Sequence, residues 1–420
     1  MIKEPALETH FPVYVGERAV AEFISYCISQ NLTKFLLVSD QNTYTALGAI
    51  VEEALREQGA DVLLVVLEGK EVVANEHFLI EVLRAADRQE RTFLAVGSGT
   101  ITDITRFVSH RTKTSFISLP TAPSVDGYTS LYAPLVIGGF KQSVLCYSPS
   151  AVFADLRVLS EAPHRMIAAG FGDLIGKFVA VADWKLGHLI WGEPYDEEIA
   201  RRSRQAAQNC AILADEIATG SAKAIRFLIE GLIESGFCML DAGNSAPASG
   251  AEHYISHHWE MRLLQEQRPA LLHGAKVGVG SVIAAGWYEK IGKISLDEAT
   301  DRLRDAPLPE TEKWVQEIRS VYGPAAEVVI KEQSPFIHMS EQTFVELKQR
   351  ILVDWSEIQE IADSVPSPEQ MTDWLRQAGA PVSGQELGLN ETEIRQAMQY
   401  SHYLRGRFTI NKLRLMLGIE

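Results

Sequence analysis

Short, nearly continuous apolar runs alternate with amphipathic stretches in the first part of the chain. The runs span residues 34–40, 61–67, 92–96 and 115–119. Between them, residues 46–58 and 76–88 space their apolar side chains as helices do. Strands that are apolar on both faces are typical of a buried parallel sheet, so the alternation predicts a doubly wound α/β domain.

The pattern changes after this alternation. Residues 134–145 form two apolar arms about Gly138 and Gly139, which predicts a β-hairpin. Residues 152–155 predict one more short strand, so the sheet is expected to end close to residue 158.

Helical spacing then continues to residue 420, interrupted by glycine and proline. Ser160 is the expected cap of the first of these helices, with Pro163 in its first turn. We therefore expect an α/β domain over residues 1–158 and an all-α domain over residues 159–420.

Charge and composition exclude several classes of function. The 420 residues carry a formal net charge of -16, which disfavours a general affinity for nucleic acid or anionic membranes. No signal-peptide pattern or bilayer-spanning apolar run is visible, so we expect a cytoplasmic protein without membrane insertion. The widely spaced cysteines predict reduced, buried thiols at Cys27, Cys146, Cys210 and Cys238.

The apolar run at residues 93–96 leads into Gly97, Ser98 and Gly99 and then a helical stretch. Glycines there let the amides at a helix start approach a phosphate, because no Cβ stands in the way. The same order is also common punctuation in α/β units, so the loop alone leaves both interpretations open. A second loop at residues 118–130 favours dinucleotide binding.

Three positions in the helical half offer metal ligands. Asp173 lies in an apolar stretch of small residues, while His253 follows a break and His273 precedes a glycine. One carboxylate and two imidazoles leave coordination positions open for a substrate oxygen. A structural interpretation also stands for each, since Asp173 could pair with Lys177 one turn later and the histidines could pack or cap.

Six local sequences carry a family resemblance, at residues 97–103, 120–128, 172–177, 182–185, 249–253 and 273–274. Together, in this order, they resemble the sn-glycerol-1-phosphate dehydrogenases, most closely their bacterial branch. The larger group includes glycerol dehydrogenases, iron-containing alcohol dehydrogenases and dehydroquinate synthases. The resemblance covers roughly residues 40–280 and fades in the helical tail, where residues 405–409 are still similar.

The resemblance implies an N-terminal Rossmann-like domain, an all-helical C-terminal domain and a cleft between them for NAD(H) or NADP(H). Positions that match the family's cofactor-binding residues are Asp40, Gly97, Gly99, Thr100, Ile101, Thr102, Asp103, Thr121, Ala122, Pro123, Ser124 and Ser130. Asp40 matches the acid that binds the adenosine ribose. This favours NAD over NADP, because a 2′-phosphate would meet a like charge.

The resemblance also implies a metal and a reaction. Asp173, His253 and His273 match the metal ligands, and Asp126 and His257 join Asp173 as residues that match the substrate site. The implied reaction reduces dihydroxyacetone phosphate, a phosphorylated triose, to sn-glycerol 1-phosphate, reversibly and for phospholipid biosynthesis. Zinc or nickel would polarise the substrate oxygens, while Asp126 or His257 relays the proton. A homodimer is expected.

Three alternatives stay open. A glycerol or polyol dehydrogenase would need no phosphate site, a dehydroquinate synthase-like cyclase would use NAD transiently, and a non-catalytic relative would keep only the fold. No phosphate ligand is assigned, because each nearby cation is also typical of a surface or ion-pair position; these are Lys141, Arg165, Lys177, Lys185 and Arg262.

Overall fold

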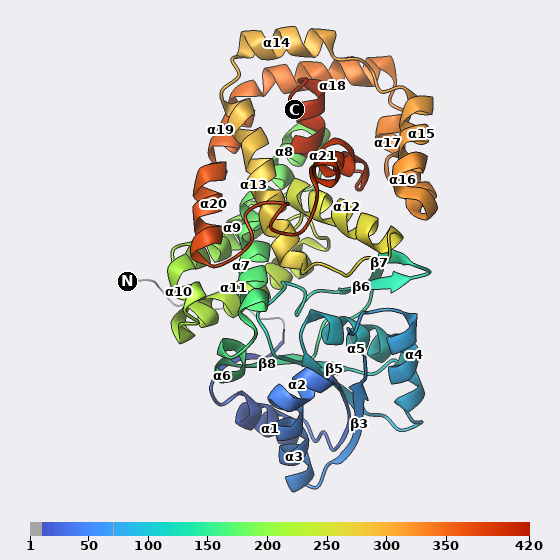
Figure 1. Cartoon of the computed structure of the whole chain (residues 1–420), viewed down its shortest axis with the longest axis vertical. Helices are drawn as coiled ribbons and strands as arrows, with labels where there is room; N and C mark the ends of the chain where they lie inside the picture. The colour runs from blue at the N-terminus through green and yellow to red at the C-terminus, as the bar shows by residue number, and fades with distance from the viewer. Residues whose placement is uncertain (1–10, 70) are drawn as a thin grey trace.

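The computed structural model describes residues 11–69 and 71–420, and its first part is built on a six-stranded parallel sheet (Figure 1). The strand order is β1-β8-β5-β4-β2-β3. Their bounds are β1 Val13–Gly16, β2 Lys34–Asp40, β3 Asp61–Leu67, β4 Thr92–Gly97, β5 Phe116–Pro120 and β8 Ala151–Asp155. The predicted parallel α/β fold is confirmed, and residues 1–10 of the expected first domain lie outside the described residues.

Helices cover both faces of this sheet. They are α1 Ala19–Ser29, α2 Gln41–Thr43, the π-helical turn Tyr44–Gly48, α3 Ala49–Glu57, α4 Glu76–Ala85 and α5 Gly99–Thr112. Phe35 and Leu37 of β2 pack with α1 and α3, whereas Leu36 and Val38 pack with α4 and α5. Because both faces of the strand are buried, β2 reads as a continuous apolar run.

The predicted hairpin is also present. Strands β6 Tyr132–Ile137 and β7 Phe140–Leu145 pair antiparallel in a separate two-stranded sheet. Gly138 and Gly139 turn the chain at φ values of 62° and 74°, which glycine adopts without strain. The hairpin lies between the main sheet and the helical part, beside α12 (Figure 1).

The rest of the chain is helical and stacks above the sheet in Figure 1. The helices are α6 Leu156–Ser160, α7 His164–Ile175, α8 Lys177–Trp191, α9 Glu197–Ala211, α10 Ala214–Ala218, α11 Ala222–Ala242, α12 Ala251–Gln265, α13 His273–Gly292, α14 Leu296–Asp305, α15 Thr311–Tyr322, α16 Ala326–Glu332, α17 Ser334–Ile337, α18 Glu341–Val353, α19 Trp355–Asp363, α20 Pro368–Gln377, α21 Glu391–Tyr400 and α22 Ile410–Met416, with 3₁₀ turns at Gly323–Ala325 and Ser401–Tyr403. None of the described helices is long and apolar enough to cross a bilayer.

Two local features differ from the sequence expectation. Strand β1 has no counterpart in the apolar pattern, because three of its four residues are only half-buried at the edge of the sheet. Ser160 does not cap a helix: it is the last residue of α6, whose cap is Asp155, and α7 begins after Pro163. The sequence did not reveal Asp155 as a cap, because it is also the last residue of strand β8.

The last strand of the sheet, β8, ends at Asp155, and helix α6 follows directly. This change of architecture supports the proposed division of the chain near residue 158. It remains a proposal, because helices α6 and α11 also pack against β1 of the sheet.

Candidate active site

Three helices bring the candidate metal ligands together. Asp173 comes from α7, His253 from α12, and His273 is the first residue of α13. One ligand atom from each lies within 4.8 Å of the others, and His253 Nε2 is 3.6 Å from Asp173 Oδ1. Asp173 and His253 are buried, and His273 is half-buried. The arrangement is a compact set of one carboxylate and two imidazoles.

Glycines allow these elements to approach closely. A Cβ on Gly274, next to His273, would overlap the carbonyl oxygen of Ala169 on α7. A Cβ on Gly170 would overlap the carbonyl oxygen of Pro123, in the loop after β5. Larger residues would therefore separate the ligand helices from each other and from that loop.

The protonation state of the histidines suits a metal. Burial lowers the pKa of His253 to about 4 and lowers that of His273 well below its ordinary value, so both imidazoles are neutral near pH 7. His253 Nδ1 donates to Glu252 Oε1 across 2.7 Å, which leaves the Nε2 lone pair for a ligand. His273 Nδ1 is buried without a hydrogen-bond partner among the described residues. This donor set fits a divalent transition metal.

Lys177 lies between two carboxylates at the same place. Its Nζ is 2.8 Å from Asp126 Oδ2 and 3.3 Å from Asp173 Oδ1, and it donates to Ala248 O. Burial alone would lower the pKa of Lys177, but the two carboxylates raise it above its ordinary value. The structural pair of Asp173 with Lys177 is therefore present, and it coexists with the approach of both imidazoles.

Asp126 connects the second loop to the candidate metal ligands. Its backbone N–H donates to Asp173 Oδ2 at 3.0 Å, and its Oδ2 accepts from Ser235 Oγ at 2.9 Å. Tyr128 O–H donates to Ala122 O within the same loop. Thr121, Ala122, Ser124 and Asp126 are all buried. The loop is thus held rigidly beside α7.

The predicted cofactor residues gather at the carboxyl ends of neighbouring strands. Asp40 ends β2, Gly97 ends β4, and Thr121 follows β5, while β2, β4 and β5 are adjacent in the sheet. Thr121 N donates to Gly97 O at 3.2 Å, which joins the two loops. In an open parallel sheet this edge is where ligands bind.

The glycine loop leaves the N-terminus of helix α5 without a side-chain cap. Ser98, the N-cap of α5, makes no side-chain capping bond, so the first amides of α5 have no side-chain acceptor from it. Ile101 is fully buried under the loop, and Thr102 Oγ1 donates to Ser98 O at 3.1 Å. A Cβ on Gly99 would lie 2.8 Å from Val125 Cγ2, so the residue must be small. Thr100 is half-buried in the first turn.

Three of the predicted cofactor residues also have structural partners. Asp40 Oδ1 accepts from Thr43 N at 2.8 Å and caps α2. Asp103 pairs with Arg106 at 3.0 Å, and burial raises the pKa of Asp103 to about 7. Ser130 Oγ accepts from Tyr132 N at 3.1 Å. Each of these three side chains therefore stabilises its own loop or helix, in addition to standing at a predicted cofactor position.

A second cluster shares His273 with the first, and of its three members only Glu260 was absent from the set predicted from the sequence. Ligand atoms of His257, Glu260 and His273 lie within 4.8 Å of one another. Glu260 is bound by Lys141 of β7 and Lys276 of α13. The spacing of residues 253, 257 and 260 at i, i+4 and i+7 on one helix face was the available signal.

The other candidate cations lie away from these clusters. Lys185 pairs with Glu357 at 3.7 Å, Arg262 pairs with Glu266 at 2.6 Å, and Arg165 is exposed. Of the five cations considered from the sequence, only Lys141 and Lys177 therefore contact the candidate site.

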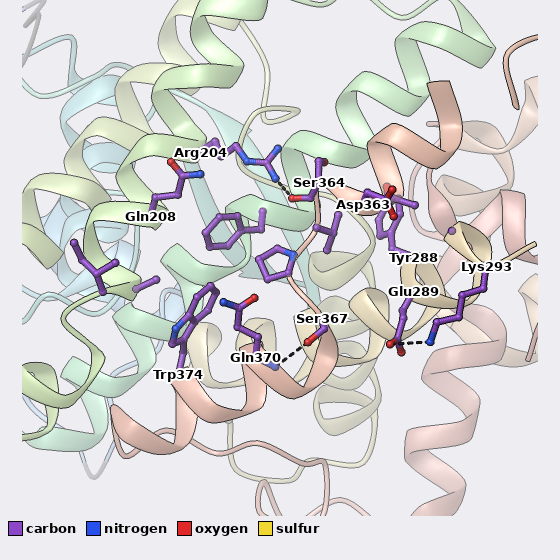
Figure 2. Close-up of a pocket in the computed structure, with 17 residues that line it drawn as sticks. Arg204, Gln208, Tyr288, Glu289, Lys293, Asp363, Ser364, Ser367, Gln370 and Trp374 are labelled. Carbon is purple, nitrogen blue, oxygen red and sulfur yellow. Dashed lines mark hydrogen bonds and ion pairs between the residues drawn. The ribbon is translucent and has the colours of Figure 1, made fainter. Parts of the chain in front are cut away.

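A separate pocket lies among α8, α9, α13 and α20 (Figure 2). Arg204 points toward Ser364 there and donates to its carbonyl oxygen, while Trp374 stacks on Phe178 at 5.7 Å between ring centroids. None of the predicted site residues lines this pocket, so it is separate from the candidate active site.

Comparison with known proteins identifies the family. Residues 14–163 match the family model described as iron-containing alcohol dehydrogenase. A protein of Geobacillus thermodenitrificans named glycerol-1-phosphate dehydrogenase (NAD(P)+) is 34% identical over 97% of this chain and 93% of its own length. The chain belongs to the glycerol-1-phosphate dehydrogenase family. A relative of the same name from Bacillus subtilis is 34% identical over 94% of this chain and 89% of its own length. Another, from Pyrococcus furiosus, is 38% identical over 65% of this chain and 77% of its own length.

Solved structures share the fold with this member of the glycerol-1-phosphate dehydrogenase family. A probable glycerol dehydrogenase from Sinorhizobium meliloti matches with a TM-score of 0.60 at 15% identity, over 97% of this chain and 95% of its own. A 1,3-propanediol oxidoreductase matches with a TM-score of 0.61 at 14% identity, over 97% of each chain. At these identities the likeness concerns the fold alone.

Proposed function

We propose that this chain catalyses the reversible, NAD(P)H-dependent reduction of dihydroxyacetone phosphate to sn-glycerol 1-phosphate. The observation that carries the proposal is the approach of Asp173, His253 and His273 to within 4.8 Å, next to the two loops at the cofactor edge. Relatives that match nearly the whole chain bear the name of this activity. This support favours the phosphate-using reaction over the polyol dehydrogenase, the cyclase and the non-catalytic relative.

The reaction balances with one hydride and one proton. When bound, the reduced nicotinamide would supply the hydride for the new C–H bond at the carbonyl carbon and become NAD⁺ or NADP⁺. The π electron pair of the C=O bond would move to the oxygen, which would take a proton. The reverse reaction oxidises the alcohol by the same steps.

Asp173, His253 and His273 would hold the metal, for which we propose zinc or nickel because the donors are a carboxylate and two imidazoles. When bound, a divalent ion polarises the substrate oxygen. Lys177 pairs with both Asp126 and Asp173, and its ammonium favours the ionised form of each; at Asp173 this opposes burial and the Asp126 charge, which raise the pKa of that carboxyl. The chain thus places one carboxylate and two neutral imidazoles close together in its interior.

For the proton we favour His257 over Asp126. Asp126 is paired with Lys177 and accepts from Ser235, and Lys177 holds the pKa of Asp126 below its ordinary value against the opposite effect of burial. His257 Nδ1 donates to Glu260 Oε2 at 3.3 Å, which leaves Nε2 to exchange a proton. The His257 side chain is 26% exposed and that of Asp126 12%, so His257 has more access to solvent.

We further propose a preference for NAD over NADP, because Asp40 stands where a 2′-phosphate would bring a like charge. A homodimer, a cytoplasmic location and a role in phospholipid biosynthesis complete the proposal. The first of these follows the general tendency of soluble enzymes to form symmetric dimers.

The configuration of the product tests the proposed function. Protein supplied with zinc or nickel is incubated with NADH and dihydroxyacetone phosphate, and the product is separated by chiral chromatography. We expect sn-glycerol 1-phosphate, and no product from the Asp173→Ala variant. Formation of the 3-phosphate enantiomer, or equal product from the variant, would refute the proposal.

A further inference from the structure

Two lysines converge on one carboxylate beside the candidate metal ligands. Lys141 Nζ lies 2.9 Å from both oxygens of Glu260, and Lys276 Nζ lies 3.2 Å from Glu260 Oε1. Lys141 comes from hairpin strand β7, Glu260 from α12 and Lys276 from α13. The cluster therefore joins the hairpin to two of the helices that carry metal ligands.

The charge of this cluster argues against a second metal. His257, Glu260 and His273 have the right distances, but two ammonium groups already neutralise the Glu260 carboxylate. A divalent cation would have to enter next to both positive charges. The two ammonium groups and one carboxylate instead leave one net positive charge, which suits an anion.

The ammonium groups also have hydrogen-bond donors to spare. Each lysine has three N–H donors, and Lys141 directs two of them to Glu260. Lys276 is fully buried, and the partner of its Nζ among the described residues is Glu260 Oε1 at 3.2 Å. A buried ammonium with one such partner leaves N–H donors for a further acceptor, which a ligand can supply.

The cluster lies close to the candidate metal ligands. His257 and Glu260 follow His253 by one and two turns of α12, and Lys276 follows His273 by one turn of α13. The ring centroids of His257 and His273 are 5.7 Å apart. The Lys141 side chain is 20% exposed, so an anion can reach it from solvent. A small molecule with a phosphate a few bonds from its reacting carbon can span the two clusters.

We propose that Lys141 and Lys276 bind the phosphate group of the substrate, with Glu260 holding both ammonium groups in position before the substrate arrives. This inference rests on the proposed function, since only a phosphorylated substrate needs the site. Charge-assisted hydrogen bonds from two ammonium groups account for selection of dihydroxyacetone phosphate over dihydroxyacetone. The competing interpretation is that the two ion pairs only anchor the hairpin to the helices.

Substrate selectivity separates these interpretations. The ratio of kcat/KM for dihydroxyacetone phosphate to that for dihydroxyacetone is measured with saturating NADH in the metal-loaded protein. We expect Lys141→Gln to lower this ratio about 10- to 100-fold and Lys141→Arg to retain part of it. Lys185→Gln is the matched control, because it removes the same charge from a side chain that pairs with Glu357, away from both clusters.

Binding of inorganic phosphate gives a readout that needs no turnover. Isothermal titration calorimetry of wild type, Lys141→Gln and Lys276→Gln with inorganic phosphate is expected to show binding only to the wild type. Thermal unfolding of each variant checks that it is folded; because Lys276 is fully buried, the less buried Lys141 carries the test if Lys276→Gln is unstable.

The outcomes distinguish the inference from the function on which it rests. Equal losses with both substrates in Lys141→Gln would show an anchor and overturn the phosphate site. An unchanged ratio with unchanged phosphate binding would overturn it as well. A wild type that does not prefer dihydroxyacetone phosphate would refute the proposed function itself, before any variant is made, and the inference would fall with it.

Discussion

Glu252 accepts a hydrogen bond from the Nδ1 of its neighbour His253 across 2.7 Å, and both side chains are buried. The second oxygen of Glu252 has no hydrogen-bond partner among the described residues, while Gly250 N donates to the first. Glu252 therefore orients His253 so that Nε2 faces Asp173. Glu252 would therefore act on the proposed metal through this histidine.

Replacing Glu252 tests this orientation. Glu252→Ala is expected to weaken metal binding about 10- to 100-fold, since a ligand histidine without its orienting carboxylate loses tautomer and ring position. Competition with a chelator, followed by measurement of bound metal, gives the dissociation constant. The variant Glu197→Ala, at an exposed position of α9, is the control. Metal affinity like that of the wild type in Glu252→Ala would contradict the assigned role.

Two glycines of α13 make a matched pair for stability. Gly274→Ala is expected to lower the free energy of unfolding by about 3 kcal/mol or more, because its Cβ would overlap Ala169 O on α7. Gly286→Ala on the same helix meets no atom within 4 Å and is expected to add about 0.5 to 1 kcal/mol.

Urea unfolding measures both variants. Bound metal is measured in parallel, and only Gly274→Ala is expected to lose it, because α13 and α7 carry two of the candidate ligands. Equal stability of the two variants would contradict the close packing of these helices.

The proposed role of Asp40 in cofactor preference can be tested by substitution. Asp40→Ser removes the charge but keeps an oxygen that can cap α2, so we expect the preference for NADH over NADPH to fall about 10-fold. The measurement is kcat/KM for each cofactor. Thr43→Ala disturbs the same cap without changing the charge and is expected to leave the preference as it is. A shift in Thr43→Ala alone would assign the effect to the cap.

A buried histidine outside the candidate metal site makes stability depend on pH. Burial lowers the pKa of His258 to about 3, and its Nδ1 lies 3.1 Å from the Tyr322 hydroxyl. Below about pH 6.5 the unfolded chain binds a proton that the folded chain does not, so stability decreases as pH falls from about 6.5 toward 3. His258→Gln is expected to lose less stability than the wild type over this range. Parallel acid-unfolding curves for the two proteins would contradict the assignment.

The sequence was most informative where burial is complete. β2 could be predicted because its residues are buried on both faces, whereas β1 could not, because an edge strand of half-buried residues has no clear period. Ser160 was a misleading cap signal, because Asp155 had already capped α6. Boundaries of this kind depend on tertiary contacts.

The residues of the candidate site also differ in whether the sequence could indicate them. Asp173, His253 and His273 could be named because their local sequences resemble a family, and they lie together in the fold. Lys276 and Glu260 could not, because a helical lysine and glutamate are ordinary surface residues until α12, α13 and the hairpin meet. Their arrangement is a property of the packed fold.

The most direct measurement of the central claim is the initial rate of NADH oxidation by metal-reconstituted protein with dihydroxyacetone phosphate, with dihydroxyacetone in parallel. We expect rapid turnover of the phosphorylated ketone and little of the other, with both rates lost in Asp173→Ala. Preference for dihydroxyacetone would assign the protein to the polyol dehydrogenases. No turnover of either ketone, or full activity in Asp173→Ala, would contradict the proposed metal-dependent reduction.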